Sequence, residues 1–269
     1  MSPIDVLRLA LAEDAPFGDI TTEHAVADVE VYGVVIAREE GIMAARPLFE
    51  SAMELLKLKI EQSVRDGEKF RAGTSLATIR GRARDVLLVE RTLLNVLGRM
   101  CGIAKLTAEY VRRAGGVPVY DTRKTMPLLR YYDKYAVRVG GGYNHRFTLS
   151  EIAMVKDNHK RIAGSVREAV RRLREALPHV PLVVEVESVE ELESLRGLDV
   201  DWVLLDNMPI NVLRDAIPLA RMMGFKVEVS GGINLENVSE YAALKPDRIS
   251  VGALTKSAVP VDVSLEVST

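Results

Sequence analysis

Residues 202–232 read WVLLDNMPINVLRDAIPLARMMGFKVEVSGG, and this stretch decides the fold. It begins with a short apolar run, Trp202–Leu205, and ends with a second one, Lys226–Val229. The segment between them, INVLRDAIPLARMM, has the apolar spacing of an amphipathic helix. Short buried strands separated by such a helix are typical of parallel strands joined by a right-handed crossover. The stretch therefore predicts a β–α–β unit.

The same alternation repeats through the C-terminal half of the chain. Further strands are predicted at Val117–Tyr120, Ile152–Lys156, Leu182–Glu187 and Arg248–Val251, with helices over residues 165–177, 189–195 and 235–244. A complete (β/α)8 barrel needs about 250 residues. Only about 140 residues, 115–254, are left for this part of the chain, enough for six or seven units. We therefore predict an incomplete parallel α/β barrel.

The N-terminal half lacks this rhythm. VEVYGVVIAREEG (29–41) and TSLATIRGRARDVLLVE (74–90) have the composition of strands, whereas residues 47–58 and 89–114 have helical spacing. This indicates a separate, sandwich-like α+β module, and the AGGVP motif at 114–118 breaks its last helix. We expect domains at 1–114 and 115–254, with a tail at 255–269 that packs back on the first domain.

The amino-acid composition excludes several classes of protein. The chain has 269 residues, a formal charge of −2 and one cysteine, Cys101, which excludes a disulfide framework within the chain and a cysteine zinc site. No apolar run reaches the ~20 residues that span a bilayer, and no signal-peptide pattern opens the sequence. We expect a cytoplasmic protein without a membrane partner, and the near-neutral charge argues against a nucleic-acid partner.

The net charge conceals an asymmetry. Residues 121–160 hold eight Lys or Arg against four Asp or Glu, a surplus of four, so the remainder of the chain carries −6. His145 and His159 lie in the same segment. A local basic cluster in a neutral protein indicates an anionic small molecule, although a solvated basic face has the same composition.

Polar or glycine clusters follow nearly every predicted strand. Turn formation explains any one of them, but ligands bind at the carboxyl ends of parallel strands, and a series of such clusters favours a site. The clusters are Asp121–Lys124, Lys156–His159, Glu185 with Glu187, Asp206–Asn207, Ser230–Gly232 and Gly252–Ala253.

Each cluster suits a particular chemistry. Ser230–Gly232 and Gly252–Ala253 follow the last two strands, where backbone N–H groups bind phosphate in barrel enzymes. Glu185 and Asp206 end neighbouring strands and could hold hydrated magnesium beside a polyphosphate.

The lysines and arginines of these clusters could have several roles. Arg123 and Lys124 are placed to grip a carboxylate. Lys156 could be a Schiff-base nucleophile, a fixed counter-charge or a snorkelling structural lysine.

With these motifs in place, the sequence resembles the quinolinate phosphoribosyltransferase family over nearly its whole length. The resemblance is carried by EDAPFGDITT, VERTLLNVLGRMCGIA, DTRKTMPLLRYYDKYAVRVGGGYNHR, MVKDNH, VVEVES, LLDNM, VEVSGGIN and ISVGALTKS. It implies the fold predicted above and a pentosyltransferase of NAD biosynthesis, which converts quinolinate and phosphoribosyl pyrophosphate (PRPP) to nicotinate mononucleotide, pyrophosphate and CO2.

The resemblance also implies roles for individual residues. Arg123, Lys124, His145, Arg146 and Lys156 would line the quinolinate pocket, and Ser230, Gly231, Gly232, Gly252 and Ala253 would bind phosphate. Glu185 and Asp206 would lie near the PRPP ribose and Mg²⁺, which they would hold through water. Lys124, Lys156, Glu185 and Asp206 would form the catalytic group. Arg91 would reach the neighbouring subunit's pocket in a homodimer, which could assemble further.

Three positions depart from the family pattern: Lys105 in place of Thr, Leu128 in place of Gly, and Phe147-Thr148 after the NHR motif. The alternatives are a molybdate-transport-linked paralogue or another phosphoribosyltransferase acting on a different ring acid, a barrel aldolase using Lys156, and a non-catalytic polyanion-binding protein. The aldolase does not explain Arg91 or the basic segment, and polyanion binding does not explain Glu185 and Asp206 at strand ends.

Overall fold

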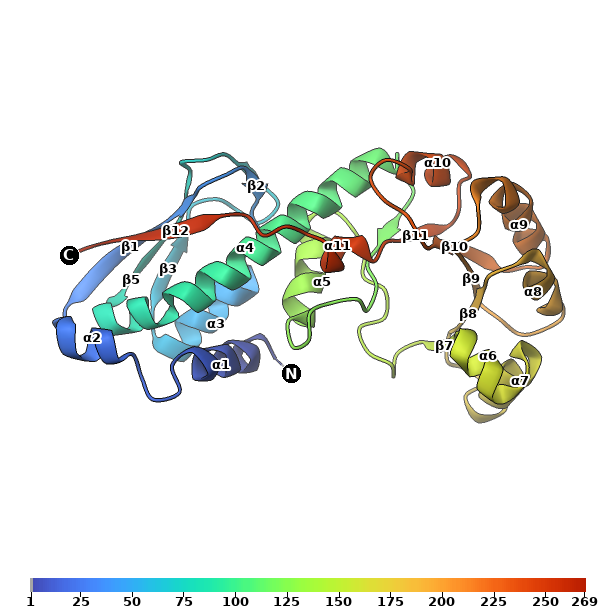
Figure 1. The fold of residues 1–269 in the computed structure, drawn as a ribbon, viewed down its shortest axis with the longest axis horizontal. Helices are drawn as coiled ribbons and strands as arrows, with labels where there is room; N and C mark the ends of the chain where they lie inside the picture. The colour runs from blue at the N-terminus through green and yellow to red at the C-terminus, as the bar shows by residue number, and fades with distance from the viewer. Residues whose placement is uncertain (1) are drawn as a thin grey trace. The chain divides into compact units, whose positions relative to one another are not determined.

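The computed structural model describes residues 2–269, which divide into two compact units (Figure 1). The first unit comprises the chain up to Ala108 together with Thr125–Gly141 and Leu254–Thr269. The second comprises Glu109–Lys124 and Gly142–Ala253. This division differs from the boundaries expected from the sequence, because Thr125–Gly141, expected within the barrel domain, belongs to the first unit.

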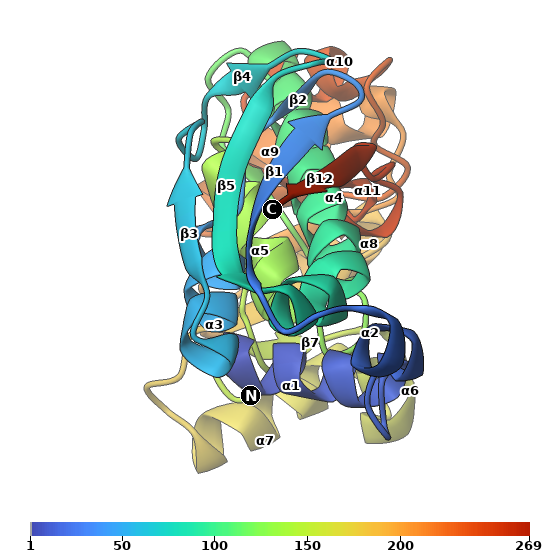
Figure 2. The same cartoon turned by 90° about the vertical axis from the view of Figure 1, so that its left-hand side faces the viewer.

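The first unit contains a four-stranded antiparallel sheet. Its order is β12 (Val263–Ser268), β1 (Glu30–Ala37), β5 (Ser75–Arg82) and β3 (Lys59–Gln62), and Figure 2 shows these strands side by side. The short strands β2 (Gly41–Ile42) and β4 (Lys69–Phe70) pair separately. The last residues of the chain therefore complete the sheet that its first strand begins.

One helix of this unit, α4, begins earlier in the chain than the sequence predicted. They are α1 (Pro3–Asp14), α2 (Ile20–Ala25), α3 (Arg46–Leu56), most of α4 (Ala83–Arg113) and α5 (Arg130–Val139). Residues 83–88, expected to continue a strand, instead open α4. Val86, Val89, Leu93 and Leu97 are all buried, and their spacing of three, four and four is that of one helix face. The apolar run VLLV alone does not reveal this period.

Two glycines of α4 receive the C-terminal segment. A Cβ at Gly102 would lie 2.1 Å from the carbonyl oxygen of Val259, and one at Gly98 would lie 2.4 Å from that of Val261. The Val261 N–H also donates to the Gly98 carbonyl oxygen at 2.9 Å. Only glycine permits this close approach, which leads the chain from the end of the second unit towards β12.

A buried ion pair explains why residues 125–141 belong to the first unit. Arg99 of α4 donates two hydrogen bonds of 2.7 Å to Asp133 of α5, whose side chain is fully buried. Arg99 also donates to the Thr255 carbonyl oxygen at 2.8 Å, and the Met126 N–H donates to Asp133 at 3.1 Å. Bidentate pairing of this kind joins α4, α5 and the C-terminal segment.

The second unit is a six-stranded parallel sheet with covering helices, and all six strands predicted from the sequence are present. The order is β6 (Val119–Tyr120), β11 (Arg248–Ser250), β10 (Lys226–Ser230), β9 (Trp202–Asp206), β8 (Leu182–Val186) and β7 (Ala153–Val155). Helices follow as α6 (Asp157–Ala163), α7 (Val166–Ala176), α8 (Val189–Ser194), α9 (Ile210–Met222) and α10 (Val238–Ala243). Figure 1 shows α8, α9 and α10 on one face of the sheet.

This arrangement confirms the incomplete α/β barrel. The short helix α11 (Ala253–Lys256) follows its last strand. Within residues 2–269, no helix combines the length and apolar character needed to cross a membrane.

The loop before α5 holds a testable departure from the family pattern. Leu128 is exposed and has φ +67°, a left-handed conformation that costs a non-glycine residue about 1 kcal/mol or more. We therefore expect Leu128→Gly to raise stability by about 1 kcal/mol, or the Tm by about 2–4 °C. Leu129→Gly is the matched control, because Leu129 has φ −81° and glycine there should lower stability. Thermal unfolding of both variants measures this, and a lower Tm for Leu128→Gly would contradict it.

Candidate active site

The second unit contains a cavity of about 360 Å³ at the carboxyl ends of its strands. Charged and hydroxyl side chains dominate its wall, and Met154 and Leu204 supply the apolar part. The full lining is Thr122, Arg123, Lys124, His145, Arg146, Met154, Lys156, Glu185, Leu204, Asp206, Glu228, Ser230 and Ser250. Every strand of the sheet contributes directly or through the loop that follows it.

Strand register explains why these side chains face one cavity. Alternate residues of a strand point to the same face, and residues paired in register stand beside each other. Glu228 of β10 is in register with Leu204 on one side and Arg248 on the other. Two residues further on, Ser230 is in register with Asp206 and Ser250. The face opposite the covering helices therefore carries the cavity wall.

Two arginines form the basic side of the cavity. Burial, followed by the positive charge of Arg123, lowers the pKa of Arg146. Arg146 donates to the Ile152 carbonyl oxygen at 2.7 Å, whereas the buried Nε of Arg123 has no hydrogen-bond partner. Within the described residues neither guanidinium forms an ion pair with a carboxylate. Two neighbouring cations that form no ion pair with a carboxylate of the described residues suit an external anion.

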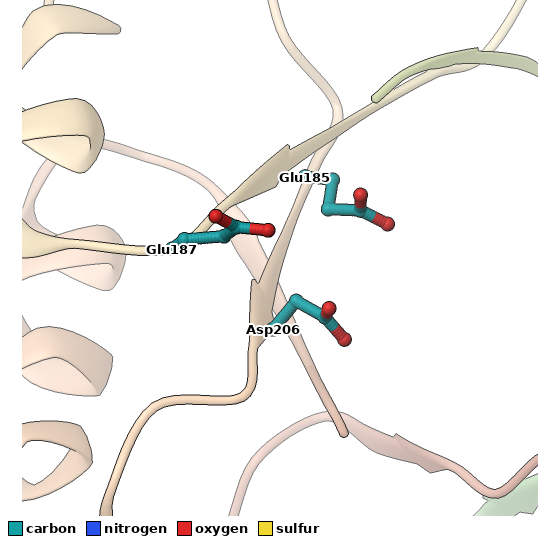
Figure 3. Close-up of side chains that lie close together, drawn as sticks. All are labelled: Glu185, Glu187 and Asp206. Atoms are coloured by element: carbon teal, nitrogen blue, oxygen red, sulfur yellow. The ribbon is translucent and has the colours of Figure 1, made fainter. Parts of the chain in front are cut away.

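Carboxylates also line the cavity. Lys156, which follows β7, forms a short ion pair with Glu185 of β8. Burial and then the Glu185 charge raise the pKa of Asp206, at the end of β9, above its ordinary value. Figure 3 shows the carboxylates of Glu185 and Asp206 pointing to the same side, with Glu187 beside them. One oxygen of each of the three lies within 4.8 Å of the others, which suits a hydrated divalent cation.

The predicted phosphate loops follow β10 and β11. Gly231 has φ +94°, and a Cβ there would lie 2.5 Å from the backbone nitrogen of Asn207, so the loop after β10 packs tightly on the loop after β9. Gly232 has φ +63° and open space where a Cβ would stand. A Cβ at Gly252 would lie 2.8 Å from Cδ of Lys124, so the lysine stem rests on this glycine. Ala253 begins α11.

The structure brings together most residues singled out in the sequence. The wall of the cavity includes Arg123, Lys124, His145, Arg146, Lys156, Glu185, Asp206 and Ser230. Gly231, Gly232, Gly252 and Ala253 lie just beyond the strand ends and outside this wall. Arg91 belongs to the first unit, where it is exposed on α4 and lines a separate hollow with residues that include Leu94 and Asp262.

Sequence reasoning missed Glu228, Arg248 and Ser250. Glu228 is fully buried on the inner face of β10, with Arg248 and Ser250 beside it on β11. The available signal was a glutamate in the middle of the apolar strand KVEVS and an arginine opening the strand RIS. Charged residues on strands that are buried on both faces are rarely placed without a partner.

Comparison with known proteins places the chain in a family. The sequence model described as quinolinate phosphoribosyl transferase, N-terminal domain, matches residues 19–101, and the model of the C-terminal domain matches residues 103–266. The chain is 39% identical to the nicotinate-nucleotide pyrophosphorylase [carboxylating] of Mycobacterium leprae, covering 97% of this chain and 96% of that one. It is 35% identical to quinolinate phosphoribosyltransferase [decarboxylating] 1b of Nicotiana tabacum, with 98% and 82% covered.

A solved structure agrees with these sequence matches. The nicotinate-nucleotide pyrophosphorylase of Ehrlichia chaffeensis superposes with a TM-score of 0.92 at 32% identity, covering 98% of each chain. The two domain matches, the full-length relatives and the shared fold show that this chain belongs to the quinolinate phosphoribosyltransferase family.

Proposed function

We propose that this protein transfers the phosphoribosyl group of PRPP to quinolinate and releases CO2, giving nicotinate mononucleotide and pyrophosphate. The observation that carries the proposal is the Arg123–Arg146 pair, which forms no ion pair with a carboxylate within residues 2–269 and lines the same cavity as Glu185 and Asp206. Quinolinate is a planar dianion, and each guanidinium can bind one carboxylate through two hydrogen bonds. Its ring would rest against the apolar part of the wall, Met154 and Leu204.

PRPP would occupy the remaining side of the cavity. Ser230 and the glycine loops after β10 and β11 offer hydroxyl and backbone N–H groups to its phosphates. Lys124 rests on Gly252 at the same edge and would add a positive charge. As pyrophosphate departs, the ribose gains oxocarbenium character, which the negative charges of Glu185 and Asp206 would stabilise.

Magnesium is the cation that this donor set suits. One oxygen each of Glu185, Glu187 and Asp206 lies within 4.8 Å of the others, and burial followed by the Glu185 charge raises the pKa of Asp206. Glu185 and Asp206 would hold the ion through water, as the hydration preference of Mg²⁺ favours. When bound, it would neutralise charge on the departing pyrophosphate.

Lys156 acts in this proposal as a counter-charge. Its ammonium group is paired with Glu185, and a protonated amine has no lone pair with which to form a Schiff base. The chemistry needs no protein nucleophile. The quinolinate ring nitrogen attacks the ribose carbon, the carbon–oxygen bond to pyrophosphate breaks, and the ring becomes cationic. The 2-carboxylate then leaves as CO2, and its electron pair on the ring carbon takes a proton from water.

We further propose that the active form is a homodimer in which Arg91 enters the cavity of the neighbouring subunit. Arg91 is exposed on α4 and belongs to a different unit from the cavity residues. An exposed arginine at this position would add a third cation to the quinolinate side of the partner's site.

The Arg123 assignment predicts a selective loss of quinolinate binding. Arg123→Ala should weaken quinolinate binding about 10–100-fold, the effect of losing a charge-assisted hydrogen-bond pair, and should change PRPP binding much less. The measurement is product formation from quinolinate, PRPP and magnesium by wild type and variant. Arg161→Ala, an exposed cation paired with Asp157, is the control. Equal loss of both substrates would contradict the pocket assignment, and no product from wild type would contradict the function itself.

The Asp206 assignment predicts a pH dependence of magnesium binding. Because the pKa of Asp206 is raised, its carboxylate takes up a proton at a higher pH than an ordinary aspartate, and the protonated form binds cations poorly. As the pH falls, the affinity for Mg²⁺ in the presence of PRPP should therefore begin to weaken at a higher pH than it would with an ordinary aspartate at this position. Asp206→Asn should bind Mg²⁺ weakly with little pH dependence, whereas the exposed Asp199→Asn should match wild type. Calorimetric titration measures this, and an unchanged pH profile in Asp206→Asn would refute it.

Mixing experiments test the role of Arg91 across subunits. Arg91→Ala and Lys156→Ala should each be nearly inactive alone, since each lacks one residue at every site. Mixed dimers should regain activity, because one of their two sites combines Lys156 of one chain with Arg91 of the other. The control is each variant refolded alone under the same conditions. Failure of the mixture to exceed that control would mean that Arg91 does not act across the interface.

A further inference from the structure

Glu228, Arg248 and His145 form a buried cluster against the cavity, and the proposed chemistry assigns no role to its central carboxylate. Glu228 is fully buried, and Arg248 and His145 are almost so. Arg248 donates from Nε at 2.8 Å and from Nη2 at 2.5 Å to Oε2 of Glu228, while the Ser250 hydroxyl donates to Oε1. Nε2 of His145 lies 3.4 Å from the same Oε2. Four donors therefore converge on one carboxylate.

The hydrogen bonds of His145 define its tautomer. The backbone N–H of Arg146 donates to Nδ1 of His145 at 2.7 Å, so Nδ1 carries no proton. A neutral imidazole must then carry its proton on Nε2, which faces Glu228. Nε2 cannot accept a hydrogen bond from Nη2 of Arg248, although these atoms are 3.3 Å apart. Oε2 of Glu228 thus accepts from two donors that would otherwise repel each other.

The backbone and the ring of His145 are held by different residues. Its backbone N–H donates to the buried carboxylate of Asp121 at 2.9 Å, which fixes the main chain. The ring is held by Glu228 on one edge and by the Arg146 amide on the other. Because His145 and Arg146 are adjacent in the chain, the positions of the His145 ring and of the Arg146 guanidinium depend on the same short segment.

Arg248 is buried and is not part of the cavity lining. Its guanidinium lies 3.8 Å from the ring centre of Trp202 and 5.1 Å from that of Tyr120, and its charge is compensated by Glu228. Burial alone would raise the pKa of Glu228, but the His145 hydrogen bond and the Arg248 charge lower it to about 2. The carboxylate is therefore ionised at neutral pH.

We propose that Glu228 is a positioning residue for the quinolinate side of the site. It orients His145 as the Nε2–H tautomer and neutralises Arg248, so that Arg123 and Arg146 remain the cations available to a dianion. This inference rests on the proposed function for its substrate, but not for the orientation of His145.

Glu228→Gln tests the proposal. The amide oxygen has two lone pairs for three donors, namely two N–H groups of Arg248 and the Nε2–H of His145, and the longest contact is the first lost. We expect the KM for quinolinate to rise about tenfold, as for loss of one charged hydrogen bond, with the KM for PRPP little changed. Nitrogen NMR of histidine-labelled protein, with His145 assigned through His145→Gln, should show one ring tautomer in wild type and both in the variant.

The control variant is Asp201→Asn, which weakens a structural ion pair with Arg174 at the opposite end of β9 and should change neither KM nor the His145 signal. If Glu228→Gln does not fold, the double variant Glu228→Leu/Arg248→Met removes both charges together and should give the same changes. An unchanged quinolinate KM, or a raised KM with an unchanged His145 tautomer, overturns the proposal. Absence of wild-type turnover with quinolinate would instead refute the proposed function, and the His145 signal would still test the role of Glu228.

Discussion

Side chains alternate between the two faces of a β-strand, and the candidate site depends on this constraint. In the six parallel strands of the second unit, one face is covered by helices and every second residue points away from them. Any charged residue in that set is forced towards the interior of the incomplete barrel. Glu185, Asp206 and Glu228 occupy such positions, which is why three strands deliver carboxylates to one cavity.

Charges gathered in this way must be compensated, and the pattern of compensation gives the cavity its chemistry. Glu228 is paired with Arg248, and Glu185 is paired with Lys156. Arg123 and Arg146 form no ion pair with an acid among the described residues, and Asp206 has a raised pKa because it is buried beside Glu185. The site thus combines a cationic side and an anionic side, complementary to a dianionic ring acid and to a sugar that becomes positive during transfer.

Much of this could be predicted from the sequence, because the strongest signals were local. Short apolar runs identified all six barrel strands, and residues directly after them identified most of the cavity wall. The predictions that failed rested on a pattern that fits two structures, or depended on contacts between residues far apart in the sequence. VLLV at 86–89 fits a strand or a helix until its burial is known, and the placement of residues 125–141 depends on the Arg99–Asp133 pair, which joins residues 34 positions apart. Glu228 gave no sign of its partners, since pairing across parallel strands is invisible in one sequence.

The stability of the sheet does not by itself explain the buried cluster of Glu228, Arg248 and His145. A buried ion pair gains little stability over apolar residues of similar size, because desolvation of both ions offsets their attraction. Apolar residues at positions 228 and 248 would therefore fold the strands β10 and β11 about as well. The polar arrangement has a different benefit: it fixes the ring of His145 and confines the Arg248 charge between Trp202 and Tyr120. A site that must distinguish two carboxylates on one ring needs such rigid supports, so the ion pair is better explained by the geometry of the cavity than by the stability of the sheet.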